Sequence, residues 1–182
     1  MIDRLAFNER ISVGMERRRP LSDHLGLTGI FDFSLVRRGK IIEQDRFYNA
    51  ITNEGKNNLL NRFFNQTGAN TTGWYFGLIG AATFSSTNTS DTLASHVGWS
   101  EFTDYSGDRK AWGQGTAASQ SIAGTGPFSF TFTNTTTAEL YGAFMCSTDV
   151  GTSGILWNTA PFNAILPVQL DDVLNCSYTL QL

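Results

Sequence analysis

Side chains able to carry out acid–base or metal chemistry are few in this sequence, and their spacing matches no familiar catalytic pattern. The two histidines, His24 and His96, are far apart and form no His-x-His pair. Asp171 and Asp172 are adjacent, and neighbouring residues of an extended chain point to opposite faces. We therefore expect a hydrogen-bonded structural role for His96 and a turn at the aspartate pair.

Two further features resemble ligand sites, and each has a simpler explanation. Asp91, Asp104 and Asp108 fall in predicted loops, where they could gather around a cation, but aspartate is common in turns for its own hydrogen bonds. The glycine-rich stretch 113–115 precedes neither a helix nor a Lys-Ser/Thr pair, so it lacks the groups that cradle a phosphate. The sequence predicts no catalytic, cofactor-binding or metal-binding residues and no enzymatic activity.

The two cysteines, Cys146 and Cys176, are predicted to point inward from β-strands. They form no CxxC motif and have no histidine partners, so they match no zinc-binding pattern. Buried free thiols are the favoured interpretation, because unpaired cysteine is commonly buried. A disulfide stays open if the finished particle is extracellular, and the sequence does not fix whether the two strands are neighbours.

Three aromatic residues surround a polar loop and suggest a different class of function. Trp99, Tyr105 and Trp112 could stack on sugar rings, as in a receptor- or glycan-binding module. The alternative is that they pack in the core and at the ends of the sheet. We favour core packing and keep the glycan site as an alternative.

The charged residues are concentrated near the beginning of the chain. Residues 1–65 hold 11 of the 13 Lys and Arg residues and 8 of the 16 acidic residues, a net charge of +3. The remaining residues hold two basic and eight acidic residues, a net charge of −6. This division indicates a passive, packed module with a basic arm, and it favours attachment over turnover.

Residues 1–28 are predicted to form this arm, partly extended and ordered by contact with a partner. Acidic residues dilute its basic charge and no aromatic residue flanks the triple arginine, so we predict no nucleic-acid binding. The chain has no apolar run of membrane-spanning length and no secretory signal pattern, so we expect no membrane contact and folding in a cytoplasm. The partner-binding residues predicted in the arm are Arg4, Arg10, Arg17, Arg18 and Arg19.

Hydrophobic patterning predicts a β domain over residues 29–182 with one helix near 52–65. Residues 29–47 predict a hairpin whose turn contains Gly39. Thr52 is a suitable N-cap for the helix. The apolar face of the helix, interpreted as a core contact, consists of Leu59, Leu60, Phe63 and Phe64.

The rest of the chain predicts short strands joined by turns and one long loop over residues 80–98. Residues 74–79 are apolar throughout, which is typical of a strand covered on both faces. Such strands separated by Gly, Asn and Pro indicate an antiparallel β-sandwich, jelly-roll or immunoglobulin-like, with the helix at one end or edge. The other predicted strands lie at 99–103, 109–112, 128–133, 140–146, 155–157 and 174–182. In the strand 140–146, the residues predicted to share one face are Leu140, Gly142, Phe144 and Cys146. In the strand 174–182, the residues predicted to point inward are Leu174, Cys176, Tyr178, Leu180 and Leu182.

Five stretches in order along the chain resemble a family of small structural proteins of tailed bacteriophage virions. The resemblance covers roughly residues 29–182 and does not include the arm. The stretches are Asn49–Leu60, Trp74–Ile79, Asp91–Phe102, Arg109–Gly115 and Asp171–Leu180.

The resemblance implies a non-enzymatic virion component assembled in the cytoplasm of a bacterial host. A capsid decoration or cement protein is the leading hypothesis, and a neck, collar or tail-surface protein is the alternative. The implied partners are other virion proteins, such as a major capsid protein, together with further copies of the chain. Repeated weak contacts would suffice for such attachment, because linked sites reinforce one another.

Overall fold

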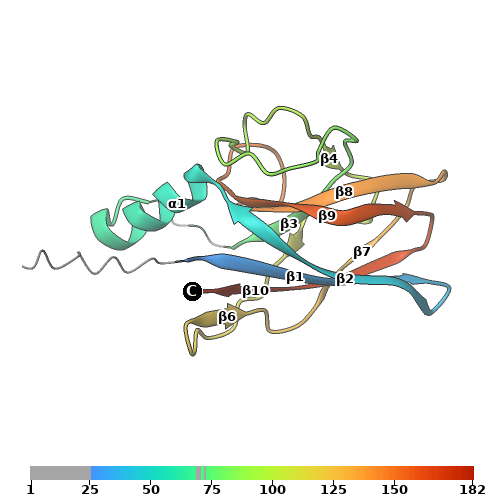
Figure 1. Cartoon of the computed structure of the whole chain (residues 1–182), viewed down its shortest axis with the longest axis horizontal. Coiled ribbons are helices and arrows are strands. Elements are labelled where there is room, and N and C mark those ends of the chain that lie inside the picture. Colours follow the sequence, from blue (N-terminus) through green and yellow to red (C-terminus); the bar gives the residue numbers. More distant parts are fainter. Residues whose placement is uncertain (1–25, 69–70, 72) are drawn as a thin grey trace, which may run out of the picture.

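A computed structural model describes residues 26–68, 71 and 73–182 (Figure 1). The described chain is a ten-stranded antiparallel sheet, strongly curled into a half-barrel, with one helical segment at one end. In chain order the elements are β1 (Thr28–Arg37), β2 (Lys40–Ile51), α1 (Asn53–Leu60), the π-helical turn η1 (Asn61–Asn65), β3 (Tyr75–Ile79), β4 (Glu101–Phe102), β5 (Lys110–Ala111), β6 (Ser121–Ala123), β7 (Phe128–Thr131), β8 (Ala138–Cys146), β9 (Leu156–Val168) and β10 (Val173–Gln181). Within these residues, neither helical element has the length or apolar content that a membrane span requires.

The sheet bends sharply at the junction of β2 with β9. The strand order is β4-β3-β8-β9-β2-β1-β10-β6, with β5 beside β3 and β7 beside β10. Strand β2 pairs with β1 over nearly its whole length but with β9 only at Ala50 and Ile51. The two halves of the sheet therefore separate beyond this junction and enclose a core rich in phenylalanine.

The predicted β class, the hairpin and the helix are confirmed. Strands β1 and β2 are joined by a two-residue turn in which Arg38 has φ 50° and Gly39 has φ 76°. Positive φ at both positions gives a turn whose twist matches that of the flanking strands. Residues in α1 and η1 together span the predicted helix near 52–65.

The loop over residues 80–98 forms a second, smaller core on the outer side of the sheet. Its residues Phe84 and Leu93 pack with Trp99 against Ile79 of β3 and Phe144 of β8. This cover explains why β3 is buried on both faces, as its continuous apolar run predicted.

The predicted shared face of Leu140, Gly142, Phe144 and Cys146 is wrong for Leu140. The pairing of β8 with β9 shifts between Leu140 and Gly142, so the alternation of side chains changes phase there. Leu140 packs in the main core, whereas Phe144 and Cys146 pack in the second core beneath the loop. A shift of one residue in a strand moves every later side chain to the opposite face of the sheet from the one predicted by alternation.

The short strand predicted at 155–157 is the beginning of the longest strand in the sheet. Strand β9 continues through Pro161 and Pro167 to Val168. Proline removes a ladder hydrogen bond and so predicted a break. Pro161 pairs with Gly142 of β8, next to a register shift between Leu140 and Gly142. The strand continues past Pro161 in spite of this irregular pairing.

Both cysteines are buried as free thiols, as predicted, on strands β8 and β10, which do not pair with each other. Burial raises the pKa of the Cys146 thiol and of the Cys176 thiol, which further suppresses the reactive thiolate. We expect neither thiol to react with iodoacetamide until the protein is denatured, after which mass spectrometry should show two alkylated cysteines. Fast alkylation of the native protein would contradict the burial.

Candidate functional site

The beginning of helix α1 is held firmly against strand β9. The Thr52 hydroxyl accepts a hydrogen bond from the backbone N–H of Gly55 at 3.0 Å and caps the helix. The Glu54 carboxylate accepts hydrogen bonds from the backbone N–H groups of Leu93 (3.3 Å) and Leu156 (2.7 Å). A Cβ at Gly55 would lie 2.8 Å from the Trp157 carbonyl oxygen, so only glycine fits this contact.

The end of the helical segment, in contrast, projects away from the sheet (Figure 1). No residue of η1 is buried, and the only buried residue of α1 is Gly55. Phe63 is 75% exposed and Phe64 is 71% exposed, with their rings edge to face at 5.0 Å between centroids. The prediction that this apolar face is part of the core is therefore wrong for Leu60, Phe63 and Phe64, and only Leu59 packs against the core.

An apolar groove of about 520 Å³ runs between the projecting helix and the nearby ends of β6 and β10. Leu182, predicted to point inward, is half exposed and lines this groove. We call it the helix-end groove, and its lining consists of Leu27, Leu59, Leu60, Phe63, Phe64, Ala117, Gln120, Ser121, Ile122, Leu180, Gln181 and Leu182.

The helix-end groove has the chemistry of a docking surface. None of the described residues that line it carries a charged side chain. Two exposed phenylalanines beside exposed leucines are unusual on a soluble surface, where large contiguous apolar patches mark sites of interaction. The groove is suited to binding another apolar surface.

A second cavity, of about 480 Å³, adjoins the groove through Leu59, Ile122 and Leu180. Its lining includes three tryptophans, of which Trp112 and Trp157 are buried. The ring faces of these two tryptophans are therefore covered by protein.

The three aromatic residues proposed for sugar stacking are all buried. The Trp99 ring lies 5.1 Å from that of Phe144, the Tyr105 ring 4.9 Å from that of Phe130, and the Trp112 ring 5.1 Å from that of Tyr178. These contacts correspond to the core packing that we favoured. Of the three, Trp112 lines the second cavity and none lines the helix-end groove.

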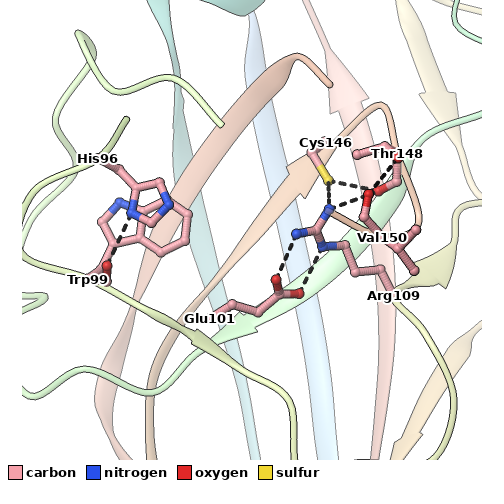
Figure 2. A network of polar contacts seen from close by, with 7 residues as sticks. All are labelled: His96, Trp99, Glu101, Arg109, Cys146, Thr148 and Val150. Carbon is pink, nitrogen blue, oxygen red and sulfur yellow. Dashed lines mark hydrogen bonds and ion pairs between the residues drawn. The ribbon is translucent and has the colours of Figure 1, made fainter. Parts of the chain in front are cut away.

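The most prominent polar network is internal and structural (Figure 2). The Arg109 guanidinium donates to both carboxylate oxygens of Glu101, at 2.8 and 2.7 Å, and to the Thr148 carbonyl at 3.1 Å. It also donates to the Cys146 sulfur at 3.4 Å. Burial lowers the pKa of Arg109, but the hydrogen bond to Glu101 raises it, so the net shift is upward and the guanidinium stays charged. The network ties strand β4 to the residues that follow β8.

His96 has the structural role predicted for it. Its ring stacks on Trp99 at 3.6 Å between centroids, and its Nδ1 lies 3.1 Å from the Trp99 carbonyl oxygen (Figure 2). Asp91 accepts a hydrogen bond from the Trp99 indole at 3.0 Å. No cluster of three potential metal ligands occurs among the described residues, so Asp91, Asp104 and Asp108 do not gather around a common point.

The aspartate pair lies in the predicted turn before the last strand. Asp171 has φ 65°, and the Asp172 carboxylate accepts hydrogen bonds from Arg37 at 2.8 and 2.7 Å and from the Gln169 N–H at 2.9 Å. Burial raises the pKa of Asp172, but the hydrogen bonds from Arg37 and Gln169 outweigh it and hold that pKa below its usual value. Through Arg37, Asp172 therefore links the end of β1 to the turn that precedes β10.

The predicted arm residues Arg4, Arg10, Arg17, Arg18 and Arg19, with His24, lie outside the described residues. The groove itself was missed by the sequence analysis, although a signal for it exists. The first half of the helix, from Asn53 to Asn58, is polar, and its apolar residues are confined to the second half. Such a helix has no apolar stripe along its length with which to lie on a sheet.

Comparison with known proteins does not assign this chain to a family. No family model matches it, and no curated protein is significantly similar to it. The function must therefore be argued from the groove and from the chemistry of the chain.

Proposed function

We propose that this chain is a non-enzymatic structural component of a tailed bacteriophage virion, assembled in the cytoplasm of the bacterial host. A capsid decoration or cement protein is the role we favour, and attachment at the neck, collar or tail surface is the alternative position. The observation that carries the proposal is the helix-end groove, an exposed apolar surface without charged side chains. The Arg109–Glu101 and Arg37–Asp172 contacts elsewhere in the body are internal and structural. An apolar surface of this kind is suited to permanent contact with protein neighbours.

The fold suits this role. A curled antiparallel sheet with two cores provides a stiff body, and its polar ties hold the loops in place. We propose that the sheet belongs to the jelly-roll or immunoglobulin-like class of β-sandwich. The partners in this proposal are other virion proteins and further copies of the chain, with no nucleic acid, membrane or cofactor.

The proposal also assigns attachment to the basic residues of the first 28 positions. We expect the triple variant Arg17→Ser, Arg18→Ser, Arg19→Ser of the full chain to bind particles that lack this protein with lower occupancy than the wild type. Each basic residue in a charged contact contributes a modest, salt-sensitive attraction, and symmetry multiplies the loss. Occupancy is measured by co-sedimentation with particles across a range of salt concentrations.

A matched control is available in the turn between β1 and β2. The variant Arg38→Ser, Lys40→Ser removes exposed positive charge without touching the arm, and we expect it to bind as the wild type does. Equal binding of the triple variant and this control would refute the role of the arm. If the wild-type chain binds no particle and is found on no virion by electron microscopy, the proposed function is wrong.

A further inference from the structure

We propose that the helix-end groove binds a second copy of this chain, in a two-fold contact that inserts Phe63 and Phe64 of each copy into the groove of the other. The inference deepens the proposed function by naming the partner of this surface. It does not depend on where the protein sits on a virion.

The shape of the surface favours contact with itself. The same patch contains two projecting aromatic rings and, beside them, an apolar groove lined by the ends of β6 and β10. In a two-fold contact each patch meets an identical patch, so a projection and a recess on one surface complement each other. Aromatic side chains that enter a partner's pocket commonly supply most of the affinity of an interface.

The charge of the lining also favours a second copy over the basic segment that precedes Leu27. A two-fold contact places like charges close together, and this lining has no charged side chain to be repelled. Residues 1–25 contain five arginines and four acidic residues. Among the described lining residues these would find no oppositely charged side chain, so no side chain there would compensate for the desolvation of that segment.

The exposed apolar area approaches that of a small dimer interface. Fully buried phenylalanines cover about 150–250 Å² each, so Phe63 and Phe64 together expose roughly 300 Å². With the half-exposed Leu60 and Leu182 the patch reaches roughly 450 Å², within the range of the largest apolar patch on a typical monomer, which is often functional. Two such patches bury roughly 900 Å² before the rim of the groove is counted, close to the ~1,000 Å² expected of a specific interface.

The test is the oligomeric state of the full-length protein by sedimentation equilibrium. We expect a wild-type dimer and a largely monomeric Phe63→Asp variant. Loss of one central aromatic contact weakens binding by about 30-fold, and the two-fold contact loses it twice, so the dissociation constant should rise by about a thousandfold. The dimer should persist at high salt, because the side chains that line the groove are apolar or uncharged.

Ile41→Asp provides a matched control. Ile41 is also an exposed apolar residue, at the start of β2 and at the opposite end of the sheet from the helix (Figure 1), and this variant should remain dimeric. Circular dichroism melts check that each variant is folded. If Phe63→Asp fails to fold, the milder Phe63→Ser, Phe64→Ser variant replaces it, since neither ring is buried.

A monomeric wild type at every concentration would overturn the inference, as would a dimer that Phe63→Asp and the double serine variant leave intact. A dimer that dissociates at high salt would also overturn it, because the contact would then be ionic. A protein that dimerises as expected but binds no virion refutes the proposed function and leaves this inference standing.

Discussion

Phe130→Asp is expected to abolish folding, whereas Thr131→Asp is expected to leave a folded protein. Phe130 is 1% exposed on strand β7 and packs against Tyr105 in the main core. Burying the phenylalanine stabilises the fold by roughly 1.5–3 kcal/mol, and an unpaired carboxylate at the same place adds several kcal/mol of cost. The sum is comparable with the whole stability of a domain, about 5–15 kcal/mol.

Thr131 is the matched control because it is the next residue of the same strand and points to solvent. It pairs with Val173 across the ladder, and aspartate there costs about 1 kcal/mol in β propensity. Circular dichroism and thermal melting of the two variants provide the comparison. Equal melting temperatures would show that the face assigned to Phe130 is wrong.

The strands that the sequence predicted best are those with one buried face. Phe130, Leu174 and Tyr178 alternate with polar residues, and the structure buries each of them in the main core. Alternation depends only on the geometry of an extended chain, so it can be recognised without knowing which strands pair. The β1–β2 hairpin is equally local, because the conformation of its turn follows from two residues.

The predictions from sequence failed where contacts with a distant segment of the chain determine which side chains are buried. The phase change in β8 depends on the irregular pairing with β9, which no local pattern encodes. The long loop builds a second core from Phe84 and Leu93, two apolar residues isolated among polar ones. Phe63 and Phe64 are exposed because of the direction in which the helix leaves the sheet. The close contact of Gly55 with Trp157 at the start of the helix sets that direction.

The candidate site was therefore found only in the structure, although Leu59, Leu60, Phe63 and Phe64 were among the residues that the sequence pattern identified. The apolar face of the helix was recognised, but hydrophobicity alone does not tell whether a face meets its own core or another chain. The arginine-rich arm and the groove are separate features, and they suggest two kinds of contact. If both proposals hold, the first contact depends on charge and the second on apolar surface, so salt should weaken the proposed attachment to particles and leave the proposed self-association intact.

Breaking the Glu101–Arg109 pair is expected to be the most damaging change outside the apolar core. Arg109 has a side chain only 4% exposed, and in Glu101→Leu it would keep its charge but lose both carboxylate contacts. Removing one partner of a buried pair typically costs about 3–5 kcal/mol, and we expect the lower end because Glu101 is partly solvated. Urea unfolding measures the loss, which should lower the melting temperature by roughly 6–12 °C in a domain of this size.

Two further variants separate the cost of an unpaired buried charge from a general effect of losing an ion pair. The double variant Glu101→Leu, Arg109→Met removes both charges, and it should regain most of the lost stability because apolar replacements of similar volume leave no buried ion. The exposed pair Arg46–Asp32 is the control, where Asp32→Asn should leave the urea unfolding curve nearly unchanged. If Glu101→Leu is no more harmful than Asp32→Asn, the Arg109 network does not hold β4 to the residues after β8. The Arg109 guanidinium carbon lies 5.1 Å from the centroid of the Phe144 ring. If the double variant is less stable than Glu101→Leu alone, the loss of stability comes from lost packing of Arg109 on Phe144 and not from an unpaired buried charge.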